Sequence, residues 1–247
     1  MPTNEKVLAV IPARWASTRF LGKPIADILG KPMVQWVSEQ AHKASLITEV
    51  VVATDDKRIY DVVHDFGGKA VMTSLNHQSG TDRAAEVAKN LECDIVVNIQ
   101  GDEPLIDPGL IDQLAEKISN DSTICMITAA VLGINNLDLA NSNVVKTVIN
   151  KENNAIYFSR SVIPHQNSES PAAPCYRHKG IYGYTKDFLL KFVRWEPSPL
   201  ELAERLEQLR AIENGASIHV IITDDNSIGV DTPEQAIMVE QQILANT

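Results

Sequence analysis

The sequence has no excess of positive charge. Lysine and arginine together number 22 against 32 aspartates and glutamates, which gives a formal net charge of −10. A protein that binds nucleic acid along its backbone needs cations to displace the counterions of the phosphates. The composition therefore argues against a nucleic-acid partner, and any clustered cations should serve a small anionic ligand.

Cysteine and long apolar runs are also scarce. The three thiols, Cys93, Cys125 and Cys175, are widely spaced and form no CxxC pair, which favours reduced thiols over disulfides or a zinc site. No apolar run approaches the roughly 20 residues that span a bilayer. The N-terminal MPTNEK lacks the apolar core of a signal peptide. We therefore expect a cytoplasmic protein without a membrane partner.

What the first half of the chain does contain is an alternation of strand and helix patterns. Residues 7–12 form a continuous apolar run, typical of a strand buried on both faces, and residues 32–45 follow with apolar residues at helical spacing. Such repetition predicts an α/β fold, a mostly parallel twisted sheet with helices on both faces, as in Rossmann-like proteins. The expected strands are 7–12, 49–55, 69–74 and 94–100, and the expected helices 32–45, 56–66, 81–91 and 107–119.

The alternation stops after residue 120. Residues 124–134, 144–150 and 154–160 read as strands with no helix between them, so we expect a smaller antiparallel insertion or edge over about 120–185 within a single domain, 1–247. The segment 164–180 is rich in Pro, Ser and Ala and is expected to be a loop. Beyond it we expect a strand at 180–185, two helical stretches within 186–214, a strand at 217–223 and a terminal helix at 232–244.

Three cations, Arg14, Arg19 and Lys23, lie in a short loop directly after the first strand, together with Gly22 and Gly30. In an open parallel sheet, ligands bind at the carboxyl ends of the strands. Glycine lets backbone N–H groups approach phosphate oxygens, and Arg and Lys can hold a phosphate. The spacing matches neither GxxxxGK[ST] nor GxGxxG, which disfavours P-loop ATPases and Rossmann dehydrogenases. The competing interpretation is a solvated loop.

Two further segments place polar residues at strand ends. In NIQGDEP, Asp102 could hold a divalent cation, and its hard oxygen ligands suit Mg²⁺; the alternative is a polar turn before Pro104. In HQSGTDR, Ser79 and Gly80 could contact the edge of a flat base with small side chains and backbone groups. The alternative is that the segment is a plain polar loop with a helix N-cap at Thr81, which accounts for the same residues.

Taken together, these segments resemble the nucleotide-sugar pyrophosphorylase superfamily and, within it, the cytidylyltransferase family that activates 3-deoxy-manno-octulosonate (Kdo) for bacterial lipopolysaccharide. The resemblance extends over nearly the whole chain in the right order. The blocks that carry it are IPARWASTRFLGKP at 11–24, HQSGTDR at 77–83, VVNIQGDEPLI at 96–106, YFSRSVIP at 157–164, RHKGIYGY at 177–184, LEQLRA at 206–211 and GVDTPE at 229–234.

The resemblance implies a nucleotidyltransferase that converts CTP and Kdo to CMP-Kdo and diphosphate, with Mg²⁺ as cofactor. It implies catalytic roles for Arg14, Lys23 and Asp102, and a metal held by Asp102 and Asp231. It also implies a homodimer, with the region 120–185 as the interface. The implied nucleotide-binding residues are Arg14, Ser17, Thr18, Arg19, Lys23, Ser79, Gly80, Arg83 and Gln100, and the implied sugar-binding residues are Gln100, Arg160, His178, Tyr182 and Glu207.

Several alternatives stay open. Asp231 could be a helix cap, His178 could lie on a strand face, Tyr182 could be core, and Glu207 could pair with Arg210 along a helix. The substrate could be 8-amino-Kdo or a sialic acid, the nucleotide could be UTP, or the chain could be a non-catalytic nucleotide-binding module.

The chain departs from the family pattern in its first block. Leu21 stands where the family usually has proline, and Trp15 stands where tyrosine is common. Proline would stiffen the loop by fixing φ, so we expect a looser phosphate loop that keeps its charges.

Overall fold

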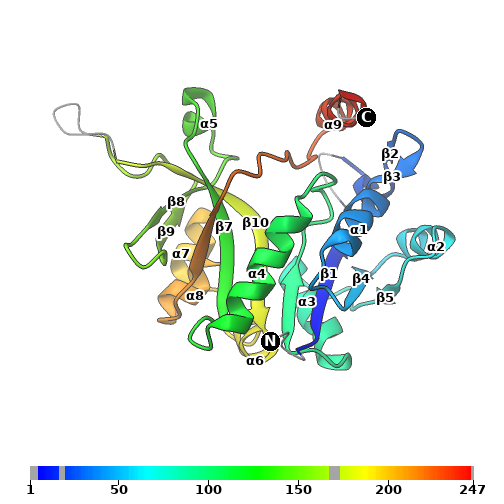
Figure 1. Cartoon of the computed structure of the whole chain (residues 1–247), viewed down its shortest axis with the longest axis horizontal. Coiled ribbons are helices and arrows are strands. Elements are labelled where there is room, and N and C mark those ends of the chain that lie inside the picture. Colours follow the sequence, from blue (N-terminus) through cyan, green and yellow to red (C-terminus); the bar gives the residue numbers. More distant parts are fainter. Residues whose placement is uncertain (1–4, 17–19, 167–172, 246–247) are drawn as a thin grey trace.

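A twisted sheet runs through the molecule, with helices packed against both faces (Figure 1). The computed structural model describes residues 5–16, 20–166 and 173–245. Within these ranges the main sheet has nine strands. Its order is β11-β7-β10-β6-β1-β4-β5, with β8 beside β10 and β9 beside β8, and a separate hairpin pairs β2 with β3.

The strands are β1 Val7–Ala13, β2 Asp27–Ile28, β3 Lys31–Pro32, β4 Glu49–Thr54, β5 Ala70–Met72, β6 Ile95–Asn98, β7 Met126–Leu132, β8 Lys146–Ile149, β9 Ala155–Ser159, β10 Tyr176–Thr185 and β11 His219–Thr223. The helices are η1 Lys23–Ile25 (a 3₁₀ turn), α1 Met33–Lys43, α2 Lys57–Asp65, α3 Gly80–Asn90, α4 Pro108–Asn120, α5 Asn136–Ala140, α6 Lys186–Phe192, α7 Pro199–Glu204, α8 Leu209–Glu213 and α9 Pro233–Ala245.

The first half of the chain confirms the predicted α/β pattern. β1 is parallel to both β4 and β6, and β4 is parallel to β5. Alternate residues of β1 enter different cores: Ile11 packs with α1 and α4 on one face, and Val10 packs with α3 on the other. This two-sided burial explains why the strand is a continuous apolar run. The carboxyl ends of β1, β4 and β6 therefore meet at one edge of the sheet.

The second half differs from the prediction in its boundaries. β10 lies between β6 and β7 and is antiparallel to both, while β7 is parallel to β11, so both strands belong to the main sheet. Only β8 and β9 lie off its path. β10 begins at Tyr176, inside the segment expected to be a loop. Pairing of Tyr176 and Arg177 with β7 and β8 outweighs the local loop composition there.

The helices of this half also differ from expectation. The short α5 separates β7 from β8, where no helix was predicted, and Asn135 caps it by accepting from the N–H of Asp138. Five residues are too few for a helical period to be visible in the sequence. The stretch 186–214 contains three helices, α6, α7 and α8, where two were expected.

Two negative findings apply to the part of the chain that the structure describes. No helix there is both long and apolar enough to cross a membrane. Cys93, Cys125 and Cys175 are free thiols, as predicted.

Candidate active site

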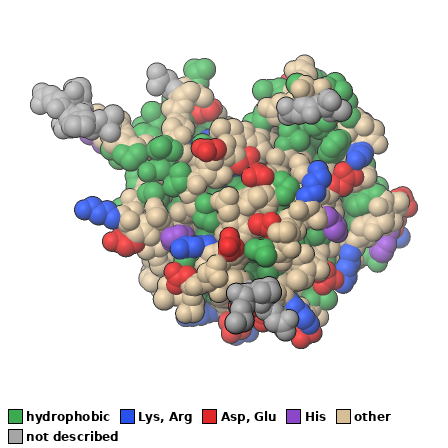
Figure 2. All heavy atoms as spheres, viewed as in Figure 1, with side chains coloured by type: hydrophobic (Ala, Val, Ile, Leu, Met, Phe, Trp, Pro, Cys, Tyr) green, Lys and Arg blue, Asp and Glu red, His purple; other side chains and the backbone are tan. Residues whose placement is uncertain are grey.

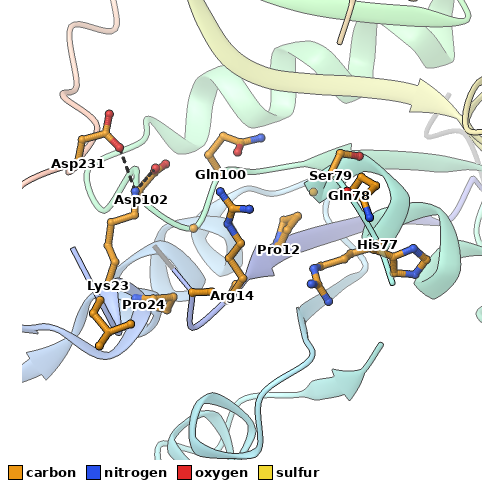
Figure 3. A pocket seen from close by; sticks show the side chains of 16 residues that line it. Pro12, Arg14, Lys23, Pro24, His77, Gln78, Ser79, Gln100, Asp102 and Asp231 are labelled. Atoms are coloured by element: carbon orange, nitrogen blue, oxygen red, sulfur yellow. Dashed lines mark hydrogen bonds and ion pairs between the residues drawn. The ribbon is translucent and has the colours of Figure 1, made fainter. Parts of the chain in front are cut away.

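A cavity of about 690 Å³ opens where the loops after β1 and β6 meet the N-terminus of α3 (Figure 3). It will be called the first cavity. Its lining residues are Pro12, Ala13, Arg14, Ala16, Leu21, Lys23, Pro24, His77, Gln78, Ser79, Gly80, Arg83, Gln100, Gly101, Asp102 and Asp231.

Two carboxylates converge on one ammonium group at an edge of this cavity (Figure 3). Lys23 Nζ lies 2.6 Å from Asp102 Oδ2 and 3.1 Å from Asp231 Oδ1. Lys23 opens η1, Asp102 follows β6, and Asp231 precedes α9. Asp102 is 79 positions and Asp231 is 208 positions from Lys23 in the sequence, yet the three side chains meet in the folded protein. Two carboxylates that reach one cation in this way are also within reach of one small metal ion, and their hard oxygens suit Mg²⁺.

Close backbone packing holds the Asp102 turn in place. A Cβ on Gly101 would lie 2.7 Å from the carbonyl oxygen of Pro12, so only glycine lets this turn approach β1. The N–H of Val230 donates to the Asp102 carbonyl at 2.7 Å. Asp102 and the segment that carries Asp231 are therefore tied through the main chain as well as through Lys23.

The other side of the first cavity is the N-terminus of α3. Ser79 caps this helix in a capping box with Asp82, so the cap is Ser79 rather than Thr81, the alternative considered from sequence. Arg83 lines the cavity but is 4% exposed. Its guanidinium pairs with Asp55 and donates to Thr73 Oγ1 at 2.8 Å. The protein itself thus occupies much of the hydrogen-bonding capacity of Arg83.

Arg14 is exposed and its side chain extends across the first cavity toward Gln100 (Figure 3). Trp15, next to it, has the Arg58 guanidinium stacked on its ring at 3.4 Å. Leu21 is 68% exposed at the cavity rim. The remaining predicted phosphate-loop residues, Ser17, Thr18 and Arg19, lie outside the described residues.

A second cavity of about 150 Å³ adjoins the first. The two share Gly80 and Gln100, so Gln100 lies at their junction. Its lining residues are Gly80, Thr81, Gln100, Met126, Tyr182, Tyr184, Phe192, Glu207 and Gln208. Three of the predicted sugar-binding residues, Gln100, Tyr182 and Glu207, therefore meet here.

Polar groups in and beneath the second cavity are bonded to one another. Tyr182 Oη lies 3.0 Å from His178 Nε2, which is 3.1 Å from Thr128 Oγ1. Glu207 accepts a hydrogen bond from Thr81 Oγ1. His178 is thus linked to this cavity through Tyr182.

Burial controls the protonation of these groups. Desolvation, with a contribution from the neighbouring Lys179, lowers the pKa of His178 to about 3, so the imidazole is neutral near pH 7. Desolvation raises the pKa of Tyr182 well above its usual value, and the nearby Glu207 adds to this. Burial also raises the pKa of Glu207, although the Thr81 hydroxyl opposes the rise. The second cavity therefore offers neutral hydroxyl groups and a single acidic side chain, with the neutral imidazole of His178 bonded to Tyr182 behind it.

Arg160 lies away from both cavities. Its guanidinium donates to the carbonyl oxygens of Glu204 at 2.8 Å, Ser142 at 3.0 Å and Arg205 at 3.3 Å. In this structure the side chain ties β9 to the end of α7 and is not among the lining residues.

Sequence reasoning missed several residues of this region. His77 and Gln78 line the first cavity and Gln208 the second, although all three lie within or beside the quoted motifs. Lys179 was also missed. This buried lysine lies 3.2 Å from Glu103 and 3.0 Å from Asp225. Arg177 and His178 precede it in the same strand, so the local sequence does not mark this lysine as buried.

A mostly parallel α/β sheet with a cation-bearing loop after β1 and paired carboxylates at the same edge is an arrangement suited to nucleotidyl transfer. A family model described as "Cytidylyltransferase" matches residues 8–218. A 3-deoxy-manno-octulosonate cytidylyltransferase from Geotalea uraniireducens (strain Rf4) is 52% identical over 238 residues, which cover 92% of this chain and 95% of the relative. One from Leptospira interrogans is 50% identical over 230 residues, covering 93% and 92%. The chain therefore belongs to the 3-deoxy-manno-octulosonate cytidylyltransferase family.

Solved structures agree with this assignment. A CMP:2-keto-3-deoxy-manno-octonic acid synthetase complexed with CTP superposes with a TM-score of 0.93 at 41% identity, covering 98% of this chain and all of that one. A cytidylyltransferase from Leptospira borgpetersenii shares the fold, with a TM-score of 0.68 at 19% identity over 98% of this chain and 88% of the other.

Proposed function

We propose that the protein transfers CMP from CTP to Kdo, forming CMP-Kdo and releasing diphosphate. The relatives that share about half of its residues are named for this cytidylyltransferase activity. The observation that carries the proposal is the convergence of Asp102 and Asp231 on Lys23, in a cavity that shares Gln100 and Gly80 with a smaller one. Two adjoining cavities with different chemistry suit two different substrates.

The first cavity is the proposed CTP site. Arg14 and Lys23 would hold the triphosphate and stabilise the negative charge on the leaving diphosphate, with Ser17, Thr18 and Arg19 as further proposed contacts. Ser79, Gly80 and Arg83 border the proposed place of the cytosine. Gly80 has no side chain and packs against Pro12, which leaves backbone groups and a flat surface for the base.

The second cavity is the proposed Kdo site. Gln100, Tyr182 and Glu207 line it, and His178 supports Tyr182 through the 3.0 Å bond described above. These groups would bind sugar hydroxyls, and Gln100 would orient the anomeric hydroxyl toward the α-phosphate, since it borders both cavities. Arg160 is proposed only as a more distant contact, because its guanidinium is held by three carbonyl oxygens.

The carboxylate pair fits a divalent cation. Asp102 and Asp231 would hold Mg²⁺ in place of the ammonium of Lys23, which is then free to bind phosphate. When bound, Mg²⁺ supplies neutralisation of phosphate charge and lowers the pKa of a hydroxyl close to it. The protein's own contribution is positioning: it holds the sugar hydroxyl in line with the bond between the α-phosphate and the diphosphate.

Diphosphate release tests the proposal directly. The purified protein is incubated with CTP, Mg²⁺ and Kdo, with UTP, ATP, N-acetylneuraminate and 8-amino-Kdo as parallel arms. Release that requires CTP, Kdo and a divalent metal supports the proposal. Release with another sugar keeps the mechanism and changes the substrate. Binding of CTP without release with any sugar would favour a non-catalytic nucleotide-binding module.

We further propose that the protein is a cytoplasmic homodimer that contributes to lipopolysaccharide biosynthesis. Large apolar side chains are exposed around β7, β8 and β9, including Leu132 at 58%, Ile156 at 57% and Val162 at 48%. Figure 2 shows apolar side chains gathered over this part of the face. An exposed apolar patch of this kind is typical of an interface. Sedimentation should give a dimer that Ile156→Asp weakens; a monomeric wild type would contradict the proposal.

A further inference from the structure

Lys179 is a buried cation that lies in neither cavity. It is 3% exposed on β10. Its Nζ lies 3.2 Å from Glu103 Oε2 and 3.0 Å from Asp225 Oδ2, and it donates to Ser227 Oγ at 2.6 Å and to the Ser227 carbonyl at 3.3 Å. A buried charge is costly unless it is paired, and this one is paired on two sides.

The partners of Lys179 belong to the two segments that carry the carboxylate pair. Glu103 directly follows Asp102 in the turn after β6. Asp225 and Ser227 lie in the connection between β11 and α9, residues 224–232, which will be called the strap and which crosses the end of the sheet (Figure 1). Asp231 is near the far end of the strap. One ammonium group therefore joins the Asp102 turn to the strap that positions Asp231.

The strap is ordered around this ammonium group. Asp225 Oδ1 accepts from the N–H of Ser227 at 2.8 Å, and Asp225 Oδ2 accepts from Ser227 Oγ at 3.0 Å. Further along, Val230 donates to the Asp102 carbonyl. The strap is thus attached by Lys179 near its start and by Asp102 near its end. Arg177, which donates to Asn226 Oδ1 at 3.1 Å, and Lys23, which pairs with Asp231, attach it further.

The backbone of Lys179 is also fixed by the neighbouring strand β7. The pairing of β10 with β7 shifts register between Lys179 and Tyr182. Thr128 of β7 lies at this irregularity, with its hydroxyl 3.1 Å from the Lys179 carbonyl and 2.8 Å from the Ile181 carbonyl. Such irregularities re-aim side chains near functional sites. The lysine is therefore anchored in the middle of the sheet while its ammonium reaches the strap.

We propose that Lys179 is a positioning residue that sets the separation of the Asp102 and Asp231 carboxylates for the divalent cation. Stability alone does not require a buried ionic cluster, since apolar side chains of similar volume usually serve as well or better. Groups outside the ligands that orient them typically change metal affinity 10- to 100-fold when removed. The inference rests on the proposed function, because it assigns the metal to this carboxylate pair.

The test uses a double variant, Lys179→Met with Asp225→Asn. It removes one positive and one negative charge, so the net charge near the metal does not change, while Lys179 no longer links Glu103 of the Asp102 turn to the strap. The matched control, Lys186→Met with Asp187→Asn, removes one charge of each sign at the opposite end of β10, where Lys186 donates to the Leu91 carbonyl. Mn²⁺ binding in the presence of CTP, without sugar, is measured by electron paramagnetic resonance.

We expect the double variant to bind Mn²⁺ about ten-fold or more weakly and the control to bind it within about two-fold of wild type. The single variant Lys179→Met separates position from charge. Loss of a positive charge alone should tighten cation binding, whereas loss of positioning should weaken it. Unchanged Mn²⁺ affinity in the folded double variant, or tighter binding by Lys179→Met, would overturn the inference.

The wild-type protein distinguishes the two ways in which this account could fail. If wild type releases diphosphate from CTP and Kdo while the double variant keeps its Mn²⁺ affinity, the role of Lys179 is wrong and the proposed function stands. If wild type shows neither release nor Mn²⁺ binding, the proposed function fails first. Circular dichroism and thermal unfolding establish that each variant is folded.

Discussion

The two cavities are built in opposite ways. In the first, the charged groups lie on loops and helix starts beyond the ends of β1 and β6, and Asp231 and Lys23 keep 39% and 16% of their side-chain surface exposed. In the second, the polar groups come from α3, the turn after β6, β10 and the segment before α8, and Tyr182 is only 9% exposed. An open site of fixed charges suits a flexible triphosphate, whereas a smaller site with hydroxyl and amide groups and one carboxyl group suits the hydroxyls of one sugar.

The largest effect should come from removing a charge from the carboxylate pair of the first cavity. Asp102→Asn should lower kcat/KM by roughly 10³-fold, about 4 kcal/mol of transition-state stabilisation, because it removes half of the carboxylate pair. Asp224→Asn, an exposed neighbour on the strap, is the control and should stay near wild type. Steady-state diphosphate release measures both, and an Asp102→Asn enzyme with full activity would refute the assignment.

Lys23 should matter for the nucleotide rather than for the sugar. Lys23→Met should raise KM for CTP about 10- to 100-fold, since a hydrogen bond to a charged group contributes about 1.5–3 kcal/mol, and should leave KM for Kdo little changed. The variant also leaves Asp102 and Asp231 without their shared cation. Mg²⁺ should therefore raise its melting temperature more than that of wild type. Lys31→Met, whose lysine pairs with Glu39, is the control; an equal shift in all three proteins would contradict the shared-cation arrangement.

Glu207 should show the reverse pattern. Glu207→Gln removes an acceptor oxygen from the second cavity and should raise KM for Kdo about ten-fold with little change for CTP. Glu213→Gln, whose glutamate accepts from the N–H of Leu200, should behave like wild type. Steady-state titrations of each substrate measure both KM values in both variants. A larger change in KM for CTP than in KM for Kdo would contradict the assignment of Glu207 to the sugar site.

His178 should make the protein less stable in acid. Its pKa is about 3 in the folded protein against 6.5 in the reference state, so between these values the unfolded chain binds a proton that the folded one does not. The unfolding free energy should fall as pH decreases from 6.5, by up to about 1.4 kcal/mol per pH unit from this residue. Urea unfolding at several pH values should show a shallower dependence in His178→Gln. The same slope in both proteins would mean that His178 accepts a proton while folded.

The smallest effect concerns the loop at the cavity rim. Leu21→Pro restores the residue that the family pattern favours and removes freedom from the unfolded chain. Stability and CTP binding should each change by no more than about 1 kcal/mol, as measured by thermal unfolding and by KM for CTP. A loss of activity beyond ten-fold would show that the loop needs leucine at this position.

The sequence predicts the residues of the first cavity better than those of the second, because local position in the chain locates the former and long-range strand pairing locates the latter. Asp102 lies in the turn after β6, and Lys23 lies at the end of the loop after β1. The rule that ligands bind at the carboxyl ends of parallel strands therefore predicts both residues. Asp231 came only from the family resemblance, because its local signal is that of a helix cap. Tyr182 and His178 lie inside β10, whose antiparallel pairing with β6 and β7 depends on contacts far apart in the sequence.

Long-range contacts also explain what the sequence could not provide. Local composition gave no sign that Arg160 would be bound by the carbonyls of Ser142, Glu204 and Arg205. Nor could it show that Lys179 would reach Asp225, 46 positions away. A buried ionic contact depends on which distant segments of the chain lie next to each other in the fold, and only the complete topology determines that.

The most direct test of the whole account is a crystal structure with CTP and Mn²⁺, using anomalous scattering to locate the metal. We predict an anomalous peak within coordination distance of one carboxylate oxygen each from Asp102 and Asp231, with the triphosphate along Arg14 and Lys23 and the second cavity left open beside the α-phosphate. A metal bound elsewhere, or a nucleotide that fills the second cavity, would contradict it.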